Sequence, residues 1–125
     1  MRLLLDTHVL LWWLADDPSL TRGAEGAIAN PASVVFVSAA TAWEIAIKQA
    51  LGKLDAPNDL ERQIEVNRFE TLSITTGHAY SAGTLPRHHD DPFDRMLVAQ
   101  ALDEGLTIVT RDPRLGPYGV STLAA

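Results

Sequence analysis

The sequence contains no cysteine among its 125 residues. This absence excludes disulfide bonds, thiolate metal sites and a thiol nucleophile. It also fits a protein of the reducing cytoplasm, which is the location we expect for this chain.

Positive charge is scarce as well. Ten Lys and Arg residues stand against 16 Asp and Glu residues, and the formal net charge is −6. Proteins that bind nucleic acid by broad electrostatic attraction normally carry a basic surface. Any phosphate-bearing partner of this chain therefore needs a local source of positive charge, either a bound cation or a rim of arginines in the otherwise acidic protein.

Long hydrophobic runs are also missing. The apolar stretch 3–14 is interrupted by Asp6, Thr7 and His8 and is too short to span a bilayer. Only Arg2 is basic near the start, and no small-residue cleavage site follows, so the stretch does not have the pattern of a signal peptide. We expect no membrane partner.

The residues that are present predict one α/β domain over 1–125, because 46% hydrophobic composition at this length supports one substantial core. The expected strands are short apolar runs that do not alternate with polar residues, which is typical of a parallel sheet with both faces covered by helices. We predict a central sheet of about five strands, at 2–5, 34–37, 69–74, 106–109 and 119–122. Helices are expected at 9–14, from Ser19 or Thr21 to 28, and at 39–51, 59–67 (capped by Asn58), 75–82 and 92–104.

The clearest local signal is the start of the helix at 92–104. Asp91 is a good N-cap, Pro92 suits the first helical position, and Asp94 falls at the third. Leu97 and Val98 follow three and four residues later, so Asp94 shares the face that packs inward. Favourable helix electrostatics is the ordinary explanation for an acid here, and a catalytic role is the alternative.

Three further acids lie where ligands bind in open parallel sheets, beyond the carboxyl ends of the strands. Asp6 follows the first strand, Asp112 follows the fourth, and Glu44 lies on the helix after the second. Each also has an ordinary interpretation: Asp6 as a helix cap, Asp112 as a turn residue before Pro113, and Glu44 as the surface partner of Lys48.

If these four carboxylates converge, their repulsion must be relieved, since two like charges about 4 Å apart cost about 4 kcal/mol at an effective dielectric constant near 20. Protonation or a bound cation would relieve it. An all-oxygen site without cysteine suits Mg²⁺ or Mn²⁺. Such a cation would activate water for attack on a phosphodiester and neutralise the developing charge, which reconciles the acidic composition with a nucleic-acid substrate.

Four separated motifs, LLLDTHVLLW, SAATAWEIAIKQALGKL, HHDDPFDRMLVAQA and TIVTRDPRL, occur in this order over almost the whole chain. In this respect the sequence resembles the PIN-domain ribonucleases, specifically toxins of the VapC kind from bacterial toxin–antitoxin pairs. The resemblance implies a metal-dependent endoribonuclease with a five-stranded parallel sheet, a VapB-like antitoxin as partner and a homodimeric state.

By that resemblance, the catalytic and metal-binding residues are Asp6, Glu44, Asp94 and Asp112. Asp6 and Asp94 are then the core metal ligands, Glu44 binds the metal or orients the attacking water, and Asp112 completes a second metal position or an outer contact. The hydroxyls of Thr7 and Thr110 are expected to hold the carboxylates.

Basic residues border the same motifs and are candidates for contacts with RNA or with an antitoxin, although solvated surface positions are their ordinary role. These are Arg95, Arg111, Arg114, His88 and His89. The two histidines are adjacent and cannot share one helix face, so we interpret them as residues of an exposed loop rather than as metal ligands. The tryptophans at 12, 13 and 43 are expected in the core or at a dimer interface.

Two other functions compete with the nuclease. A phosphotransfer domain would use Asp6 as nucleophile, but no second acid follows two residues later and no lysine follows a late strand. A nonenzymatic binding module would keep the acids only to contact a basic partner.

Overall fold

The computed structural model describes residues 1–125 and contains a five-stranded sheet in which every neighbouring pair of strands is parallel. The strand order is β3-β2-β1-β4-β5, so β1 lies at the centre, and Leu4 of β1 pairs with Phe36 on one side and Ile108 on the other. The strands are β1 (Arg2–Leu5), β2 (Val34–Ser38), β3 (Glu70–Leu72), β4 (Thr107–Thr110) and β5 (Thr122–Ala124). The predicted fold class is confirmed.

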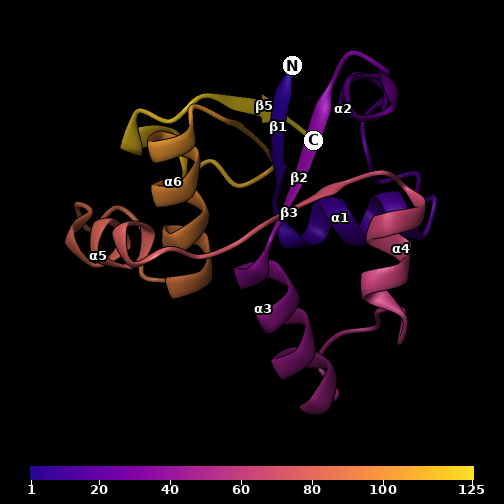
Figure 1. Cartoon of the computed structure of the whole chain (residues 1–125), viewed down its shortest axis with the longest axis horizontal. Coiled ribbons are helices and arrows are strands. Elements are labelled where there is room, and N and C mark those ends of the chain that lie inside the picture. The colour runs from indigo at the N-terminus through magenta and orange to yellow at the C-terminus, as the bar shows by residue number, and fades with distance from the viewer.

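Helices cover both faces of this sheet. In Figure 1, α1, α2 and α4 lie on one side of the strands, α5 and α6 lie on the other, and α3 projects beyond the end of β2. Their bounds are α1 (Thr7–Leu14), α2 (Arg22–Ala29), α3 (Ala39–Ala50), α4 (Leu60–Val66), α5 (Thr76–Thr84) and α6 (Pro92–Glu104), with a short 3₁₀ helix η1 (Gly116–Tyr118). Every helix falls short of the length and apolarity that a bilayer span requires.

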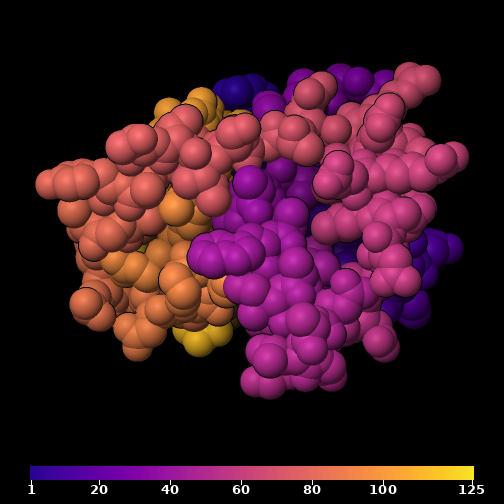
Figure 2. Space-filling view, turned by 60° about the horizontal axis from the view of Figure 1, so that its bottom comes forward, coloured from indigo at the N-terminus to yellow at the C-terminus, as the bar shows by residue number.

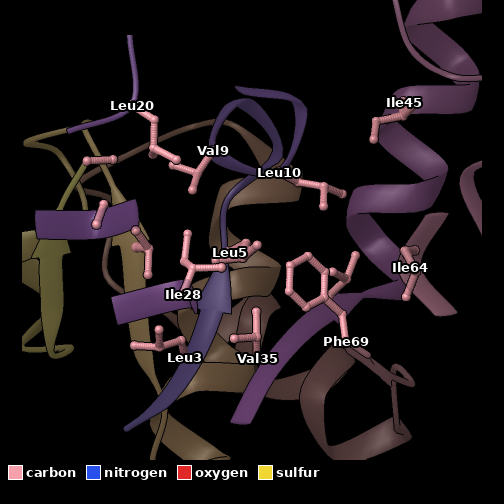
Figure 3. Packing of buried hydrophobic residues seen from close by; sticks show 14 residues of the cluster. Leu3, Leu5, Val9, Leu10, Leu20, Ile28, Val35, Ile45, Ile64 and Phe69 are labelled. Carbon is pink, nitrogen blue, oxygen red and sulfur yellow. The ribbon is translucent and has the colours of Figure 1, made fainter. Parts of the chain in front are cut away.

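The core consists of two clusters, because successive side chains of a strand point to opposite faces. Leu3 and Leu5 of β1 pack with Val9 and Leu10 of α1 on one face, as Figure 3 shows. Leu4 belongs to the second cluster, which α6 covers. All three leucines of β1 are fully buried, and burial of each contributes about 1.5–3 kcal/mol relative to an exposed position.

A buried polar contact joins α3 to α6. The Ser38 hydroxyl, which caps α3, donates to Oε1 of Gln100 on α6 at 2.6 Å, and Gln100 Nε2 donates to the Ser73 carbonyl at 3.3 Å. Figure 2 shows the surface of α3 lying between residues of α4 on one side and of α5 and α6 on the other. Since Gln100 is fully buried, this contact fixes the relative placement of the two helices that carry Glu44 and Asp94.

Most predicted helix boundaries agree with the structure. Thr21 caps α2, and Asp91 caps α6 by accepting hydrogen bonds from the amides of Phe93 and Asp94. Gly105 ends α6 with φ of 67°, a left-handed conformation that glycine adopts without strain.

Several predicted boundaries were wrong. The first helix begins at Thr7 rather than at residue 9, because Asp6 caps it directly. Asn58 does not cap α4; its Oδ1 accepts a hydrogen bond from Gln49, and Asp59 holds the N-cap position. The third strand covers only 70–72. The fifth runs over 122–124 instead of 119–122, because a left-handed turn at Gly119 occupies the start of the expected strand.

Candidate active site

A cavity of about 350 Å³ opens at the carboxyl ends of β1 and β4. The chain leaves β1 toward β2 on one side and returns through β4 on the other, so this is the point where the strand order reverses and where open parallel sheets bind ligands. Only one lining residue is hydrophobic. The lining comprises Asp6, Thr7, His8, Trp12, Glu44, Lys48, Asp91, Asp94, Arg111, Asp112 and Arg114.

Asp6 has two structural roles at once. Its Oδ1 accepts the amide hydrogen of Val9 at 3.0 Å and so caps α1, as its ordinary interpretation predicted. Its Oδ2 accepts the Thr110 hydroxyl at 2.5 Å, which ties the end of β1 to the end of β4. Burial raises the pKa of Asp6 above its usual value, although the hydrogen bonds from Thr110 and Val9 oppose this.

Glu44 lies on the cavity side of α3 with only 5% of its surface exposed. Its Oε1 accepts the Thr7 hydroxyl at 2.5 Å, and its Oε2 pairs with Lys48 Nζ at 2.5 Å. The predicted pair with Lys48 is therefore present, but Glu44 is buried rather than at the helix surface. Thr7 and Lys48 together hold both oxygens of a carboxylate that water scarcely reaches, and a buried charge requires such partners.

Among the cavity acids, Asp94 has the pKa that is shifted furthest from its ordinary value. Burial, and then the negative charge of Asp91, raise the pKa of Asp94 from 3.8 to about 6. The charges of Asp6 and Glu44 also raise the pKa of Asp94, whereas His89 lowers it. Carboxylates from three separate elements therefore repel one another across the cavity.

Asp112 follows β4 and has a different environment. Arg114 contacts it through the backbone amide at 2.9 Å and through Nε and Nη2 of the guanidinium at 3.0 and 2.8 Å. These hydrogen bonds from Arg114 lower the pKa of Asp112, so this carboxylate stays ionised to a lower pH than an ordinary aspartate. Its own amide donates to the Thr110 hydroxyl at 3.0 Å, so Thr110 bridges Asp6 and Asp112.

The predicted basic residues separate into two groups. Arg111 and Arg114 line the cavity, and the Arg111 guanidinium lies 4.3 Å from the ring centre of Trp12. Arg95 does not line it: its guanidinium donates to backbone carbonyls, including those of Ala82 at 2.9 Å and Leu85 at 3.0 Å. Arg95 thereby holds the segment that leads from α5 toward α6.

The histidines also separate. His88 is exposed and its ring lies edge-on to Tyr118, with the ring centres 4.9 Å apart. The expectation of an exposed loop was wrong for His89, which is only 8% exposed and whose Nε2 lies 2.8 Å from Asp94 Oδ2. The segment is irregular, as expected, but the loop turns the two side chains in different directions, so that His88 is exposed and His89 is buried.

The tryptophans have three different environments. Trp12 lines the cavity, and Trp13 packs near Phe69 while its indole N–H donates to Asn67 at 3.0 Å. Trp43 is 62% exposed, with its ring 5.4 Å from that of Phe93, so it is not a core residue.

The side chains of the cavity suit a hard divalent cation. The cavity gathers carboxylate oxygens, the ligand type that such ions prefer, and the pKa values of Asp6 and Asp94 are raised first by burial and further by the charges of neighbouring acids. Three potential ligand atoms, one each from His89, Asp94 and Asp112, lie within 4.8 Å of one another. A parallel α/β domain with an acidic cavity at the carboxyl ends of its central strands has the architecture of the α/β proteins that bind ligands where the strand order reverses.

Comparison with known proteins identifies the family. The family model described as PIN domain matches residues 3–119, and the chain therefore belongs to the PIN-domain family. The chain is 35% identical over 115 residues to Ribonuclease VapC22 of Mycobacterium tuberculosis, an alignment that covers 90% of this chain and 88% of that protein.

Solved structures share the fold at lower identity. A VapBC2 structure from Rickettsia felis, bound to a DNA fragment from its promoter, matches with a TM-score of 0.71 at 15% identity, covering 100% of this chain and 99% of that one. DNA-bound VapBC from Salmonella typhimurium matches with a TM-score of 0.67 at 22% identity and covers 99% of this chain and 98% of that one. The predicted membership of the PIN-domain family is confirmed.

Proposed function

We propose that this protein is a metal-dependent endoribonuclease that acts as the toxin of a toxin–antitoxin pair. The observation that carries the proposal is the cavity in which Asp6, Glu44 and Asp94 come together with their charges only partly compensated. The identity to a mycobacterial ribonuclease over most of both chains supports the same activity.

Asp6, Glu44 and Asp94 would hold the cation, Mg²⁺ or Mn²⁺, with Asp112 at a second metal position or in an outer contact. When bound, the cation supplies charge neutralisation at the phosphodiester and activation of the attacking water. The hydroxyls of Thr7 and Thr110 fix the orientation of Glu44 and Asp6 before substrate arrives, since each donates a 2.5 Å hydrogen bond to its carboxylate.

Arg111 and Arg114 supply the positive charge that the chain lacks overall. Both lie at the cavity and are exposed, which suits contact with RNA phosphates flanking the cleaved bond. Arg114 also neutralises Asp112, so an incoming phosphate meets less net negative charge at that edge. Hydrolysis consumes one water for each bond cut and leaves one phosphate monoester and one hydroxyl.

The two competing functions are less well supported. Receiver-type phosphotransfer domains have the strand order 2-1-3-4-5, whereas the order here is 3-2-1-4-5. Both oxygens of Asp6 already accept hydrogen bonds from Val9 and Thr110, which lowers its value as a nucleophile. A nonenzymatic module does not require a buried acid such as Asp94, whose pKa is raised first by burial and then by the acids gathered around it.

The partners follow from the same proposal. Solved proteins with this fold are described as VapBC complexes, which supports a VapB-like antitoxin for this chain. A homodimer and a cytoplasmic location, where RNA substrates are present, complete the proposal. Equilibrium sedimentation of the purified protein tests the dimer, and a single species at the monomer mass would contradict it.

The activity is tested with purified protein, single-stranded RNA and Mg²⁺ or Mn²⁺. Asp6→Asn and Asp94→Asn are each expected to reduce cleavage at least about 100-fold, since cation-mediated charge stabilisation is worth several kcal/mol. Asp103→Asn is the matched control, because Asp103 is an exposed aspartate on the same helix as Asp94 and does not line the cavity. Cleavage that survives both cavity substitutions, or that proceeds fully in a metal chelator, would reject the proposal.

The toxin role is tested by brief induced expression in bacteria. The wild type is expected to stop growth and the Asp94→Asn variant is not. Sequencing the RNA ends that appear after induction would reveal the target, and an identical set of ends in both strains would contradict the toxin role.

A further inference from the structure

His89 lies in the irregular segment between α5 and α6, and its backbone is held from two sides. Its amide donates to the Tyr118 hydroxyl at 2.9 Å, and that hydroxyl donates back to the His89 carbonyl at 3.3 Å. The same carbonyl accepts a hydrogen bond from Arg95 at 3.4 Å. Residues from η1 and α6 therefore fix the position from which the imidazole reaches Asp94 and Asp112.

The hydrogen bonds of the ring define which nitrogen carries the proton. Nδ1 accepts the amide hydrogen of Asp91 at 3.3 Å, so Nδ1 presents a lone pair and the ring hydrogen lies on Nε2. Nε2 is 2.8 Å from Asp94 Oδ2 and 3.4 Å from Asp112 Oδ2. The Nε2–H group thus donates to Asp94 and lies beside Asp112, two acids that come from different elements.

This arrangement decides between two roles. As a direct metal ligand, Nε2 would have to give up its hydrogen to Nδ1, and Nδ1–H would then point at the amide N–H of Asp91, with donor facing donor. As a hydrogen-bond donor, His89 needs no rearrangement. It engages Oδ2 of Asp94 and leaves Oδ1 free to bind a cation.

We propose that His89 is a positioning residue of the cation site: its Nε2–H orients Asp94 and holds it next to Asp112, so that Asp94 presents its free oxygen to the divalent ion. This inference rests on the proposed function, because it assumes that the cavity binds a cation. Outer partners of this kind typically change metal affinity about 10- to 100-fold.

The test measures Mn²⁺ binding to the whole protein by isothermal titration calorimetry, without RNA. His89→Ala is expected to weaken binding about 10- to 100-fold, whereas His89→Gln, whose amide can replace the Nε2–H donor, stays within a few-fold of wild type. His88→Ala is the matched control, since His88 is the exposed neighbour and its ring contacts Tyr118 rather than a cavity acid. Should His89→Ala fail to fold, as thermal melting without metal would reveal, His89→Asn replaces it, because its shorter amide does not reach Asp94.

Pulsed electron paramagnetic resonance of bound Mn²⁺ provides a second measurement, made on the wild type. No directly coordinated ¹⁴N is expected. A strong ¹⁴N coupling that disappears in His89→Gln would overturn the proposal and make His89 a ligand. Wild-type binding that His89→Ala leaves unchanged would overturn it while sparing the nuclease proposal, whereas a wild type that binds no Mn²⁺ would reject both.

Discussion

Replacing Asp94 with asparagine is expected to make the metal-free protein more stable at neutral pH. The folded protein raises the pKa of Asp94 from 3.8 to about 6, chiefly through burial and the charge of Asp91. A difference of about two pKa units corresponds to about 3 kcal/mol. Because the side chain keeps 23% exposure and its charge is shared with neighbouring acids, we expect a gain of about 1–3 kcal/mol in the free energy of unfolding.

Proton linkage determines at which pH Asp94 stabilises the fold and at which pH it does not. The folded state binds the Asp94 proton more tightly than the unfolded state, so this group favours folding below pH 3.8 and loses that contribution as the pH rises through about 6. Asparagine carries no charge and still offers an oxygen to His89. The advantage of Asp94→Asn is therefore greatest above pH 7 and shrinks as the pH falls toward 4.

Asp112→Asn is a control for which the opposite change in stability is expected. Arg114 lowers the pKa of Asp112, so the ionised carboxylate stabilises the fold above pH 3.8, and its removal is expected to cost under about 1 kcal/mol because Arg114 is exposed.

The assay is urea unfolding in chelator between pH 4 and 8, followed by the same series with Mn²⁺. At a Mn²⁺ concentration 100 times the dissociation constant, the free energy of unfolding is expected to rise by about 2.7 kcal/mol for the wild type and by much less for Asp94→Asn. The stability advantage of the variant therefore shrinks or reverses when Mn²⁺ is present. If Asp94→Asn is no more stable than wild type at pH 7.5 in chelator, or if its advantage does not depend on pH, the electrostatic reasoning is refuted.

Three further substitutions test individual contacts by thermal or urea unfolding. Thr110→Val removes the hydroxyl that Asp6 accepts and is expected to cost about 1–3 kcal/mol and to weaken Mn²⁺ binding, whereas Thr110→Ser, which keeps the hydroxyl, should preserve both; equal effects of the two would contradict this. Gln100→Leu leaves the Ser38 hydroxyl without its buried partner and is expected to cost about 1–3 kcal/mol; a neutral result would show that the contact does not hold α3 to α6. Leu5→Ala empties a fully buried position in the central strand and is expected to cost about 2–5 kcal/mol; a loss below 1 kcal/mol would mean that the core closes over the space.

The parts of the fold that depend on residues close together in the sequence were predictable. Asp91 and Gly105 bound α6 as expected, because a cap and a left-handed glycine act within one helical turn. The apolar strands were also identifiable, since a fully buried parallel strand needs no polar alternation, as in Leu3–Leu5. The convergence of the acids on one cavity followed from a rule about parallel sheets rather than from any single residue.

What the sequence could not provide depends on contacts between distant segments. His89 is buried because Tyr118 and Arg95 hold its backbone, and no local pattern around His89 predicts either contact. The fifth strand was displaced to 122–124 because its register is set by pairing with the distant strand β4, where Ile108 pairs with Thr122. Asp91 and Lys48 joined the cavity lining for the same reason: their places depend on how α6 and α3 meet.

The central position of β1 has a consequence for synthesis of the chain. β1 is made early, yet its neighbour β4 and the Thr110 hydroxyl that secures Asp6 come 104 positions later. A nascent polypeptide shorter than this has a central strand with one side unpaired and no assembled cavity. Incomplete translation products of this gene are therefore expected to be harmless as nucleases, and to be cleared as unfolded chains instead.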